Sequence, residues 1–442
     1  MSEKIKCLAM ASAAVQHGID LGLTAIEVHV ERTISRTVTW ESKAVLSAVS
    51  LPPKETTQSD VRVYSSIGQV GSASGSTASQ ASLSRLIDKA VESARAAPAN
   101  PHAGPADRYE QSDTGLGLMD RRSESLDDEL REEAVNDNIE DVRSINGVEP
   151  EAFRYTEVVR ERAFASSNGV RREESGSQYR LDGTVALTDG SQRVSGSVQS
   201  RLFADVASLP LGADLAKKVS RYRDPEPAPD GERAIVMEPE VIATFMHAVV
   251  PAFGRRAVEA GSSFLAEGRR VGSDKLHMID DGLVPGALET RAFDVRGVPS
   301  LDIPLIREGA VGALYQSVEM SRERDGRPCG HEGRGSVWPG NLVLRAGTRS
   351  RNMIYPDLGR FLILDSLIDD GRKWFNLKTG KLRLTGRFFS GMAGSSPVYI
   401  GVHTIETTFV ELWSGIREVA NDQRRFGSVD VSSWVVEGLS IA

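Results

Sequence analysis

Glycine directly follows asparagine or aspartate three times in the strand-and-turn stretch between Tyr155 and Val206. The pairs are Asn168-Gly169, Asp182-Gly183 and Asp189-Gly190. These residue types tolerate the positive φ that two-residue hairpin turns require at their central positions. The three pairs therefore predict antiparallel strands joined by tight turns.

A second strand signal follows an N-terminal helix that we predict over residues 3–21. The run Ile26–Glu31 alternates apolar side chains with Glu27, His29 and Glu31. Such alternation is typical of a strand with one buried face and one face in water.

Two further helices are predicted from their end signals and apolar spacing. An acidic helix is expected to open at Ser125, with Asp128 as the second member of a capping pair and Leu130 facing inward. A helix over Phe409–Val419 is expected near the end of the chain.

The length of 442 residues favours two domains, because single hydrophobic cores stop growing at roughly 250 to 300 residues. The segment RYRDPEPAPDGE, residues 221–232, holds three prolines and no apolar anchor, as expected of a linker. We predict an N-terminal domain over residues 1–222 and a strand-rich C-terminal domain over 223–442. Helices and strands alternate within each half, so the fold class expected is α+β, antiparallel-sheet-rich with flanking helices.

Charge and composition narrow the compartment and the partners. The chain carries 53 Lys and Arg against 61 Asp and Glu, a net charge of -8. This balance argues against broad binding to nucleic acid or to anionic membranes. No apolar run approaches the roughly 18 to 20 residues of a membrane span. Two distant cysteines, Cys7 and Cys329, fit a reducing compartment, so we expect a cytoplasmic protein.

The stretch FMHAVVPAFG places His247 in an apolar helical run. A zinc peptidase helix needs two histidines about one turn apart and a glutamate beside the first. Here Ala248 stands in the place of the glutamate, and Pro251 and Ala252 offer no ligand atom. The residues favour a histidine packed in the core or at an interface over a metal ligand.

Ligand-type residues cluster once more, in the glycine-rich segment RPCGHEGRG. It carries Cys329, His331 and Glu332. Neighbouring ligands on a loop still need further groups from elsewhere to complete a metal site. A solvent-exposed polar loop is therefore favoured over a metal centre.

Arginines surround the same segment. Arg324, Arg327 and Arg334 favour contact with a carboxylate, such as a peptide C-terminus or an acidic side chain of a partner. Together with Cys329 and His331, Arg327 and Arg334 form the loop that we expect to contact a peptide.

Seven short motifs in the second half occur in the order known from one family, and the chain resembles the TldD/PmbA (TldE) family, once called modulators of DNA gyrase. The motifs are GSSFL, IDD, FDVRGVP, IREG, NLVLRAG, LKTG and VEGLSI. The N-terminal half is similar through its first helix, ARAAPANPHAGPAD and Ser167-Asn168-Gly169. Two positions that are often acidic in the family, after the aspartate of the Phe-Asp turn, carry Val295 and Arg296 here.

The resemblance implies a subunit of a two-chain peptidase. In this family a TldD metallopeptidase pairs with a TldE subunit that lacks the metal site, and the heterodimer encloses a cavity for unfolded peptides. TldD-type chains carry a His-Glu-X-X-X-His helix and a cysteine near the C-terminus. Those helix positions hold His247, Ala248 and Ala252 here, and residues 418–442 contain no cysteine. The resemblance thus implies a TldE-type chain with no catalytic residue, metal or cofactor of its own.

From this we expect a partner subunit for a TldD-like zinc metallopeptidase, acting on unfolded or leader-type peptides, with natural-product peptide maturation as one setting. Leu301–Ile306 and Leu342–Leu344 are the strands expected to hold an extended peptide. The chain is expected to be a heterodimer with its partner, or a homodimer alone. The side chains considered first for the interface, although core packing is the more ordinary role of each, are Phe253, Phe409, Leu412 and Trp413.

Two alternatives stay open at the level of sequence. One is an autonomous hydrolase whose metal has moved to Cys329, His331 and Glu332. The other is a homodimeric peptide-binding module without peptidase activity.

Overall fold

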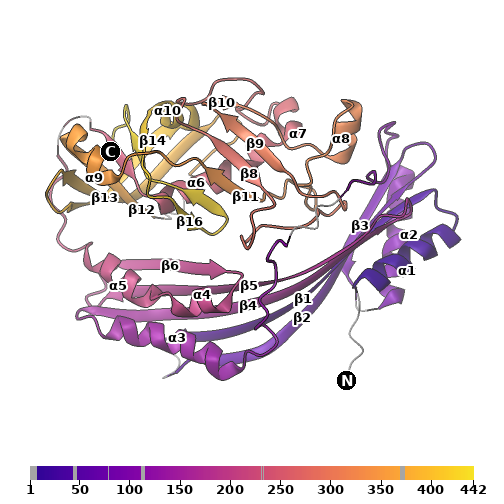
Figure 1. Ribbon diagram of the computed structural model, residues 1–442, viewed down its shortest axis with the longest axis horizontal. Helices are drawn as coiled ribbons and strands as arrows, with labels where there is room; N and C mark the ends of the chain where they lie inside the picture. Colours follow the sequence, from indigo (N-terminus) through magenta and orange to yellow (C-terminus); the bar gives the residue numbers. More distant parts are fainter. Residues whose placement is uncertain are drawn as a thin grey trace.

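A long, curved antiparallel sheet forms the first half of the chain (Figure 1). The computed structural model describes residues 7–42, 47–77, 79–110, 115–229, 231, 233–368 and 374–442. Within them the first sheet has the strand order β3-β2-β1-β4-β5-β6, with every neighbouring pair antiparallel. Its strands are β1 (Ala25–Glu41), β2 (Val49–Tyr64), β3 (Val70–Ser76), β4 (Val148–Ser166), β5 (Arg171–Leu187) and β6 (Arg193–Ser200).

Helices cover one face of this sheet at both of its ends (Figure 1). The helix bounds are α1 (Cys7–Asp20), α2 (Gln80–Ala96), α3 (Asp128–Arg143), α4 (Phe203–Ser208) and α5 (Leu211–Ser220). α1 and α2 pack on Ile26, Val28 and Val30 of β1 at one end. α3 and α5 pack on Phe153 and Tyr155 of β4 at the other end. The apolar face of the strands is thus buried by the chain's own first half.

Two smaller sheets form the second half. Their orders are β10-β9-β8-β11-β17-β16 and β14-β13-β12-β7-β18-β15. The strands are β7 (Ile235–Met237), β8 (Met278–Asp281), β9 (Asp302–Arg307), β10 (Ala310–Val311), β11 (Asn341–Leu344), β12 (Arg360–Leu367), β13 (Lys381–Met392), β14 (Val398–Thr408), β15 (Ile416–Val419), β16 (Arg424–Phe426), β17 (Val429–Val431) and β18 (Trp434–Val436). The helices are α6 (Pro239–Val249), η1 (Val250–Phe253), α7 (Arg255–Glu259), α8 (Val318–Glu323), α9 (Arg351–Ile354), η2 (Tyr355–Leu358) and α10 (Phe409–Ser414). The α+β class predicted from the sequence is confirmed.

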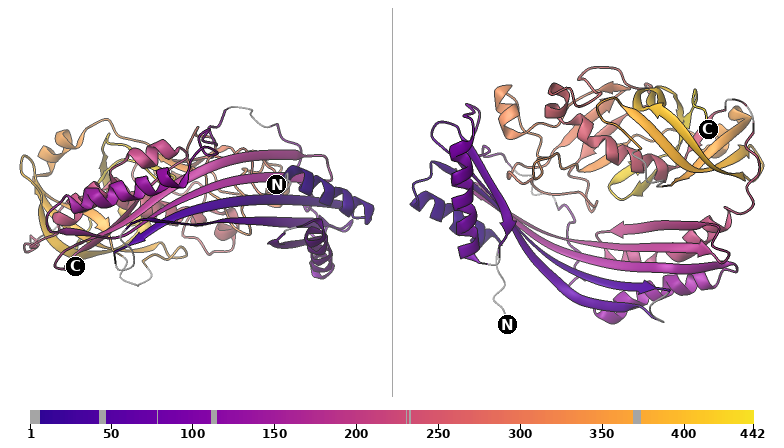
Figure 2. Two further views of the ribbon diagram at one scale, coloured as in Figure 1. Left: turned by 90° about the horizontal axis from the view of Figure 1, so that it is seen from below. Right: turned by 180° about the vertical axis from the view of Figure 1, so that it is seen from behind.

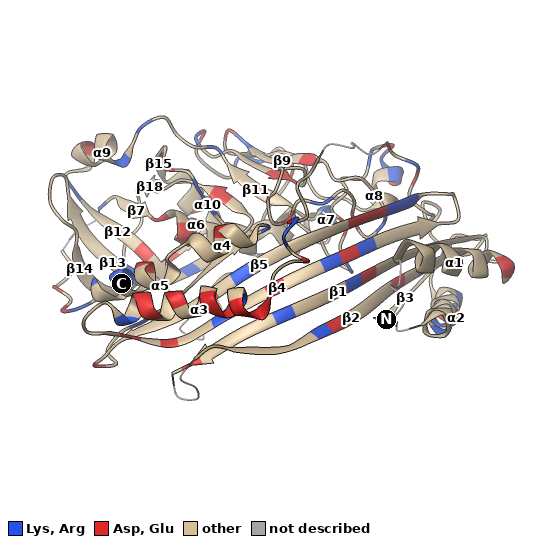
Figure 3. Ribbon diagram, turned by 60° about the horizontal axis from the view of Figure 1, so that its bottom comes forward, with Lys and Arg blue, Asp and Glu red and all other residues tan. Residues whose placement is uncertain are grey.

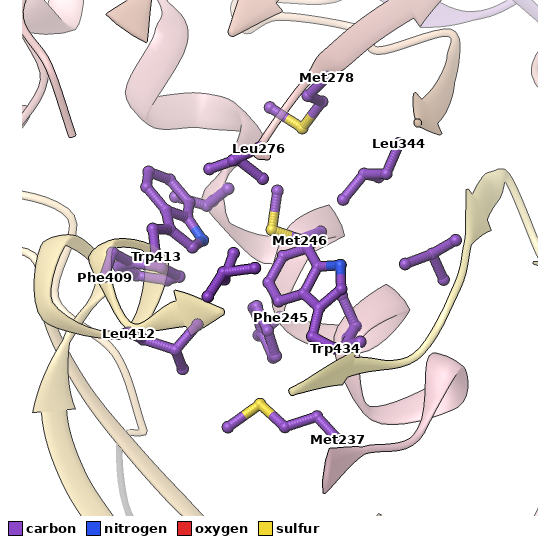
Figure 4. Packing of buried hydrophobic residues seen from close by; sticks show 14 of the residues in the cluster. Met237, Phe245, Met246, Leu276, Met278, Leu344, Phe409, Leu412, Trp413 and Trp434 are labelled. Atoms are coloured by element: carbon purple, nitrogen blue, oxygen red, sulfur yellow. The ribbon is translucent and has the colours of Figure 1, made fainter. Parts of the chain in front are cut away.

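The main hydrophobic core lies between the two smaller sheets and α6 (Figure 4). Phe409, Leu412 and Trp413 are fully buried in this core, as is Phe253. Ordinary core packing is therefore their role, and none of the four presents an interface to a partner in the isolated chain.

The strands expected to bind a peptide have no free edge. β9 pairs with β8 on one side and with β10 on the other, where Gly312 N also donates to Leu305 O. β11 lies between β8 and β17. The expectation of an added strand is wrong for Leu342–Leu344, because β11 is paired on both sides. It is also wrong for Leu301–Ile306 taken as a whole, since Pro304, Leu305 and Ile306 are already paired on the outer side of β9.

A polar connector joins the two halves. The first sheet ends with β6, and the strands of the other two sheets begin at Ile235. Between α5 and β7 the described residues of 221–232 form no helix or strand, as predicted; residues 230 and 232 lie outside the described part. A cluster containing Tyr222, Val236 and Phe361 packs against Phe153 of the first sheet. The division into domains 1–222 and 223–442 stays a prediction.

Two of the three predicted turns are confirmed. Gly169 and Gly190 have φ of 86° and 70° and lie between β4 and β5 and between β5 and β6. Asp182-Gly183, in contrast, lies inside β5 and pairs with β4 and β6. A Cβ on Gly183 would stand 2.6 Å from Phe153 Cε1. This glycine allows the close approach of an aromatic ring and does not make a turn.

Helix ends also differ from the sequence prediction. The first helix is described from Cys7, and residues 3–6 of the predicted range lie outside the described part. The acidic helix begins after Asp127, whose side chain accepts a hydrogen bond from Leu130 N, so Ser125 is not its cap. Leu130 is exposed. The last predicted helix ends at Ser414, since residues 416–419 pair with β18 as β15.

The polar face of β1 is not in water. Glu27 and His29 are only 3% and 2% exposed, because the second half of the chain lies over this face (Figure 2). The expectation of a solvated face is wrong for Glu27 and His29, in the first part of β1. None of the described helices is long and apolar enough to cross a membrane.

The different roles of two glycines give a direct test of the sheet. We expect Gly183→Asn to lower the free energy of unfolding by about 1–3 kcal/mol, because the new side chain collides with Phe153. Gly190→Asn should change it by less than about 0.5 kcal/mol, since asparagine adopts positive φ and no atom lies within 4 Å of the added Cβ. Urea denaturation measures both. Equal losses would contradict the assignment.

Candidate functional site

The helix positions that would carry a metal motif do not fit a metal. α6 ends at Val249 and continues into η1, so His247 and Ala248 lie on the last helical turn and Ala252 on the 3-10 turn. His247 is exposed, Ala248 is half-buried and Ala252 is buried in the core. A catalytic zinc site takes three protein ligands, whereas these positions offer one imidazole and two methyl groups. Because His247 is exposed, it is not a core histidine. A role for it at an interface stays a prediction.

Cys329 and His331 are buried rather than exposed, contrary to the loop expected from the sequence. The Cys329 thiol donates to Gln316 O at 3.4 Å, and burial raises its pKa to about 11. His331 Nδ1 lies 3.1 Å from Arg291 Nη2, and its Nε2 lies 2.9 Å from Leu301 O. Because a guanidinium only donates, Nδ1 accepts and the Nε2 proton goes to the carbonyl. Both side chains are held by structural contacts.

Glu332, the third ligand-type residue of the segment, contacts different residues from those that hold Cys329 and His331. Its carboxylate accepts hydrogen bonds from Arg62 and Arg296, each at 3.3 Å. Across the described ranges, no group of three or more His, Cys, Asp and Glu side chains could hold a metal ion. The geometry therefore gives no support to a joint metal site of Cys329, His331 and Glu332.

The arginines predicted to meet a carboxylate are spread apart. Arg324 pairs with Glu259, and the Arg327 guanidinium lies over the Tyr109 ring at 5.2 Å. Arg334 alone reaches the first sheet, where its Nε donates to Asp60 Oδ2 at 2.8 Å. Burial raises the pKa of Asp60, but its hydrogen bonds to His29 and Arg334 prevail and hold it at about 2.

A buried ionic network joins the two halves of the chain. Arg296, 2% exposed, donates from Nε to Glu27 Oε2 of β1 at 2.7 Å. Its Nη2 donates to the Tyr64 hydroxyl at 2.8 Å, and its Nη1 to Glu319 at 3.0 Å. A buried charge is tolerated only when it is paired and hydrogen-bonded. The network thus fixes the second half over the polar face of the first sheet.

Asp294 shapes the turn that carries Arg296. Its Oδ1 accepts from Arg296 N at 2.9 Å and from Val298 N at 3.0 Å, and its Oδ2 accepts from Glu332 N at 3.0 Å. Burial, together with the nearby Glu332 carboxylate, raises the pKa of Asp294 to about 6.

A polar chamber of about 360 Å³ lies between the first sheet and the loops of the second half. A smaller recess of about 30 Å³ shares Arg160, Gln178, Glu289 and Trp338 with the chamber. The chamber wall further includes His29, Glu31, Val295, Gly333, Arg334, Ser336 and Val337. Figure 3 shows the charged residues midway along β1, β4 and β5 that supply the sheet side of this region.

Register brings the sheet residues together. Glu31 pairs with Arg162 and Thr33 with Arg160 across β1 and β4. Paired residues present their side chains on the same face, so both arginines share the face of Glu31. The sequence shows them only as charged residues at alternate positions, and no motif connects them to Arg291.

The fold is α+β, and helix α6 with the following turn carries His247 as its single side chain able to bind a metal among the three motif positions. The sequence pattern of the PmbA/TldA metallopeptidase C-terminal domain matches residues 230–442, and that of the central domain matches residues 119–222. The chain belongs to the TldD/PmbA family.

Curated relatives agree with this assignment. The metalloprotease PmbA of Escherichia coli O157:H7 is 22% identical over 84% of this chain and 83% of its own length. A metalloprotease of Methanothermobacter thermautotrophicus is 24% identical over 42% of this chain, and one of Methanocaldococcus jannaschii is 25% identical over 38%. These two matches span only 43% and 36% of the archaeal proteins.

Solved structures share the whole fold. A Thermotoga maritima protein, described as a putative modulator of a DNA gyrase, superposes with a TM-score of 0.86, 17% identity and coverage of 98% of this chain and 99% of that one. TldE from Thermococcus kodakarensis superposes with a TM-score of 0.81, 18% identity and coverage of 98% and 100%.

The buried Asp294 carboxyl allows the contact between the two halves of the chain to be tested by varying the pH. A pKa raised from 3.8 to about 6 means that the folded chain holds this proton longer than the unfolded chain does. Its contribution to stability therefore falls as pH rises from about 4 to about 6. We expect the stability advantage of wild type over Asp294→Asn to shrink across that window by on the order of 1–3 kcal/mol. Urea denaturation at several pH values measures this, and a widening advantage would contradict it.

Proposed function

We propose that this chain is a non-catalytic, TldE-type subunit of a two-chain metallopeptidase that acts on unfolded or leader-type peptides. The cognate TldD-like chain supplies the zinc and the catalytic residues. This chain helps to enclose the peptide.

The motif helix carries the proposal. Of the three positions that bear metal ligands or the base in TldD-type chains, only His247 has a side chain able to bind a metal. Ala252 is held in the main core, where its methyl group packs with apolar neighbours. Other described side chains do not take the place of the missing ligands. Among the described residues, no three or more His, Cys, Asp and Glu side chains lie close enough together to hold a metal ion.

The peptide is proposed to lie in the chamber rather than along β9 or β11, whose edges are paired. The substrate of the two-chain peptidase is proposed to be an unfolded or leader-type peptide. Natural-product maturation is a setting that suits Val295 and Arg296, which stand where the family often has acidic residues. We further propose that the chain works in the cytoplasm, which is consistent with its free, buried Cys7 and Cys329.

Assembly is proposed to be a heterodimer with the cognate TldD-like chain, and a homodimer is the form proposed for the chain alone. The dimer surface excludes Phe253, Phe409, Leu412 and Trp413, since these are core residues. Light scattering at several concentrations measures the mass. A monomeric mass both alone and in the mixture would contradict the dimer.

Reconstitution tests the division of labour. We expect the isolated chain to leave a fluorescently labelled unfolded protein uncut, and cleavage to appear when the cognate TldD-like chain is added. His247→Ala in this chain should change the rate of the mixture by less than about twofold, because the imidazole takes no part in the chemistry. The matched control replaces the glutamate of the partner's His-Glu-X-X-X-His helix, which should abolish cleavage. Cleavage by this chain alone would refute the proposal.

The alternative of a relocated metal predicts a different result. Cys329→Ala removes a thiol whose described contact is a hydrogen bond to Gln316 O. We expect the reconstituted activity to stay within about twofold of wild type. A loss of about a hundredfold or more, with the fold intact by circular dichroism, would instead favour the autonomous hydrolase.

A further inference from the structure

We propose that the recess beside the chamber binds a carboxylate group of the bound peptide, either its C-terminus or an acidic side chain. The inference rests on the proposed peptide-binding function and adds the chemistry that recognises the peptide. It depends on the charge, the unpaired donors and the size of the recess.

Positive charge exceeds negative charge around the recess. Its wall holds four arginines and two glutamates, an excess of two positive charges. The arginines are Arg160, Arg162, Arg201 and Arg291, and the glutamates are Glu174 and Glu289. Buried charge without a counter-charge is costly, so such a wall favours an anion.

Both glutamates are already engaged. Glu174 pairs with Arg162 and accepts from Ala292 N at 2.6 Å. Glu289 accepts from Trp338 Nε1 at 3.1 Å. Glu31 lies 3.9 Å from Arg160, and Asp280 and Glu289 attract Arg291. No described carboxylate, however, accepts a hydrogen bond from either guanidinium.

Arg201 is the fourth arginine of the wall, and its donors already have acceptors. Its guanidinium donates to backbone carbonyl oxygens, among them Ala287 O at 2.8 Å and Leu288 O at 2.7 Å. Burial lowers the pKa of Arg201 to about 10; Arg160 and Arg162 push it the same way, while Glu174 and Glu289 oppose the change.

Donors without acceptors mark the place of the missing anion. Arg162 Nη1 and Arg291 Nε are buried and have no hydrogen-bond partner within the described ranges, and both side chains are 2% exposed. Arg160 is more exposed, at 34% of its side chain, and its Nε forms an ion pair with Glu31 Oε1 at 3.9 Å. That distance is too long for a hydrogen bond, so the buried Nε atom also has no acceptor among the described residues. Buried polar groups are nearly always paired in folded proteins. Three such donors around one recess point to a ligand that accepts hydrogen bonds.

Trp338 holds two of these arginines in place. The guanidinium carbons of Arg162 and Arg291 lie 4.7 Å and 4.4 Å from the centre of its indole ring. Cation–π contacts of this kind fix a guanidinium plane. A carboxylate, which accepts paired hydrogen bonds, suits such fixed donors.

Size separates the carboxylate from the rest of the peptide. The recess of about 30 Å³ exceeds the roughly 10–15 Å³ that a single water requires, and it suits one small polar group. The adjoining chamber of about 360 Å³ has space for neighbouring residues, with Val295 and Val337 as apolar contacts. The carboxylate therefore enters the recess while the chain lies in the chamber.

Three pools of labelled octapeptides, random in sequence except that Asp and Glu are left out of the random positions, test the idea by fluorescence polarisation on the purified full-length chain. One pool ends in a free carboxylate, one in an amide, and the third is the amide pool with one internal glutamate. We expect the free-acid pool or the glutamate pool to bind at least about tenfold tighter than the plain amide pool, because only these supply the anion. The pool that binds more tightly than the plain amide pool shows whether the carboxylate comes from the C-terminus or from an acidic side chain. Equal affinity of all three, including no binding up to about 1 mM, would overturn the proposal.

A matched pair of variants assigns the effect to the recess. Arg160→Gln should abolish the preference. Arg154→Gln, an exposed arginine of the same strand, should leave it unchanged. A preference that survives Arg160→Gln, or displacement of the peptide by inorganic phosphate but not by acetate, would refute the carboxylate assignment. These readouts are independent of peptidase activity, so this inference can fail while the proposed subunit role holds, and the reverse.

Discussion

The buried ion pair between Arg296 and Glu27 is the contact on which the arrangement of the whole chain depends. It joins a loop of the second half to the N-terminal end of β1, an inner strand of the first sheet, at 2.7 Å, with both side chains almost fully buried. Taking two charges out of water costs several kcal/mol per ion, and further hydrogen bonds must offset that cost. Tyr64, Glu319 and Glu332 supply them. Loops that reach this network also build the chamber wall, because Val295 and Gly333 of the wall adjoin Arg296 and Glu332.

Local sequence patterns were sufficient to predict the strands but not their surroundings. Alternation in Ile26–Glu31 correctly gave a strand, and Gly169 and Gly190 correctly gave turns. The same alternation assigned Glu27 to water, whereas it is buried. A polar face that binds another part of the chain has the same period as a solvated face, and only the tertiary contact separates them.

The turn predicted at Asp182-Gly183 was wrong for a related reason. Its composition is that of a turn, but the glycine is required because Phe153 packs against the strand at that point. The residue that packs against a dipeptide from the neighbouring strand cannot be predicted from the dipeptide alone. Likewise, the cap of the acidic helix moved from Ser125 to Asp127, since both residue types cap helices equally well.

The candidate site was predictable in part. The loss of donor groups at Ala248 and Ala252 can be read directly from the sequence, because alanine cannot bind a metal in any fold. Arg296 was also visible, as a basic residue at a position that is often acidic in the family. The recess was not predictable: Arg160 and Arg291 are 131 positions apart in the sequence and belong to no common motif. They meet because β4 presents one of them to the loop that carries the other.

The central claim is that this chain contributes structure and peptide contacts to a peptidase but no metal. Counting zinc in the purified two-chain complex by elemental analysis tests it most directly. The account predicts one zinc per heterodimer, lost when the histidines of the partner's motif are replaced and retained in His247→Ala of this chain. Two zinc ions per heterodimer, or one held tightly by this chain alone, would contradict it.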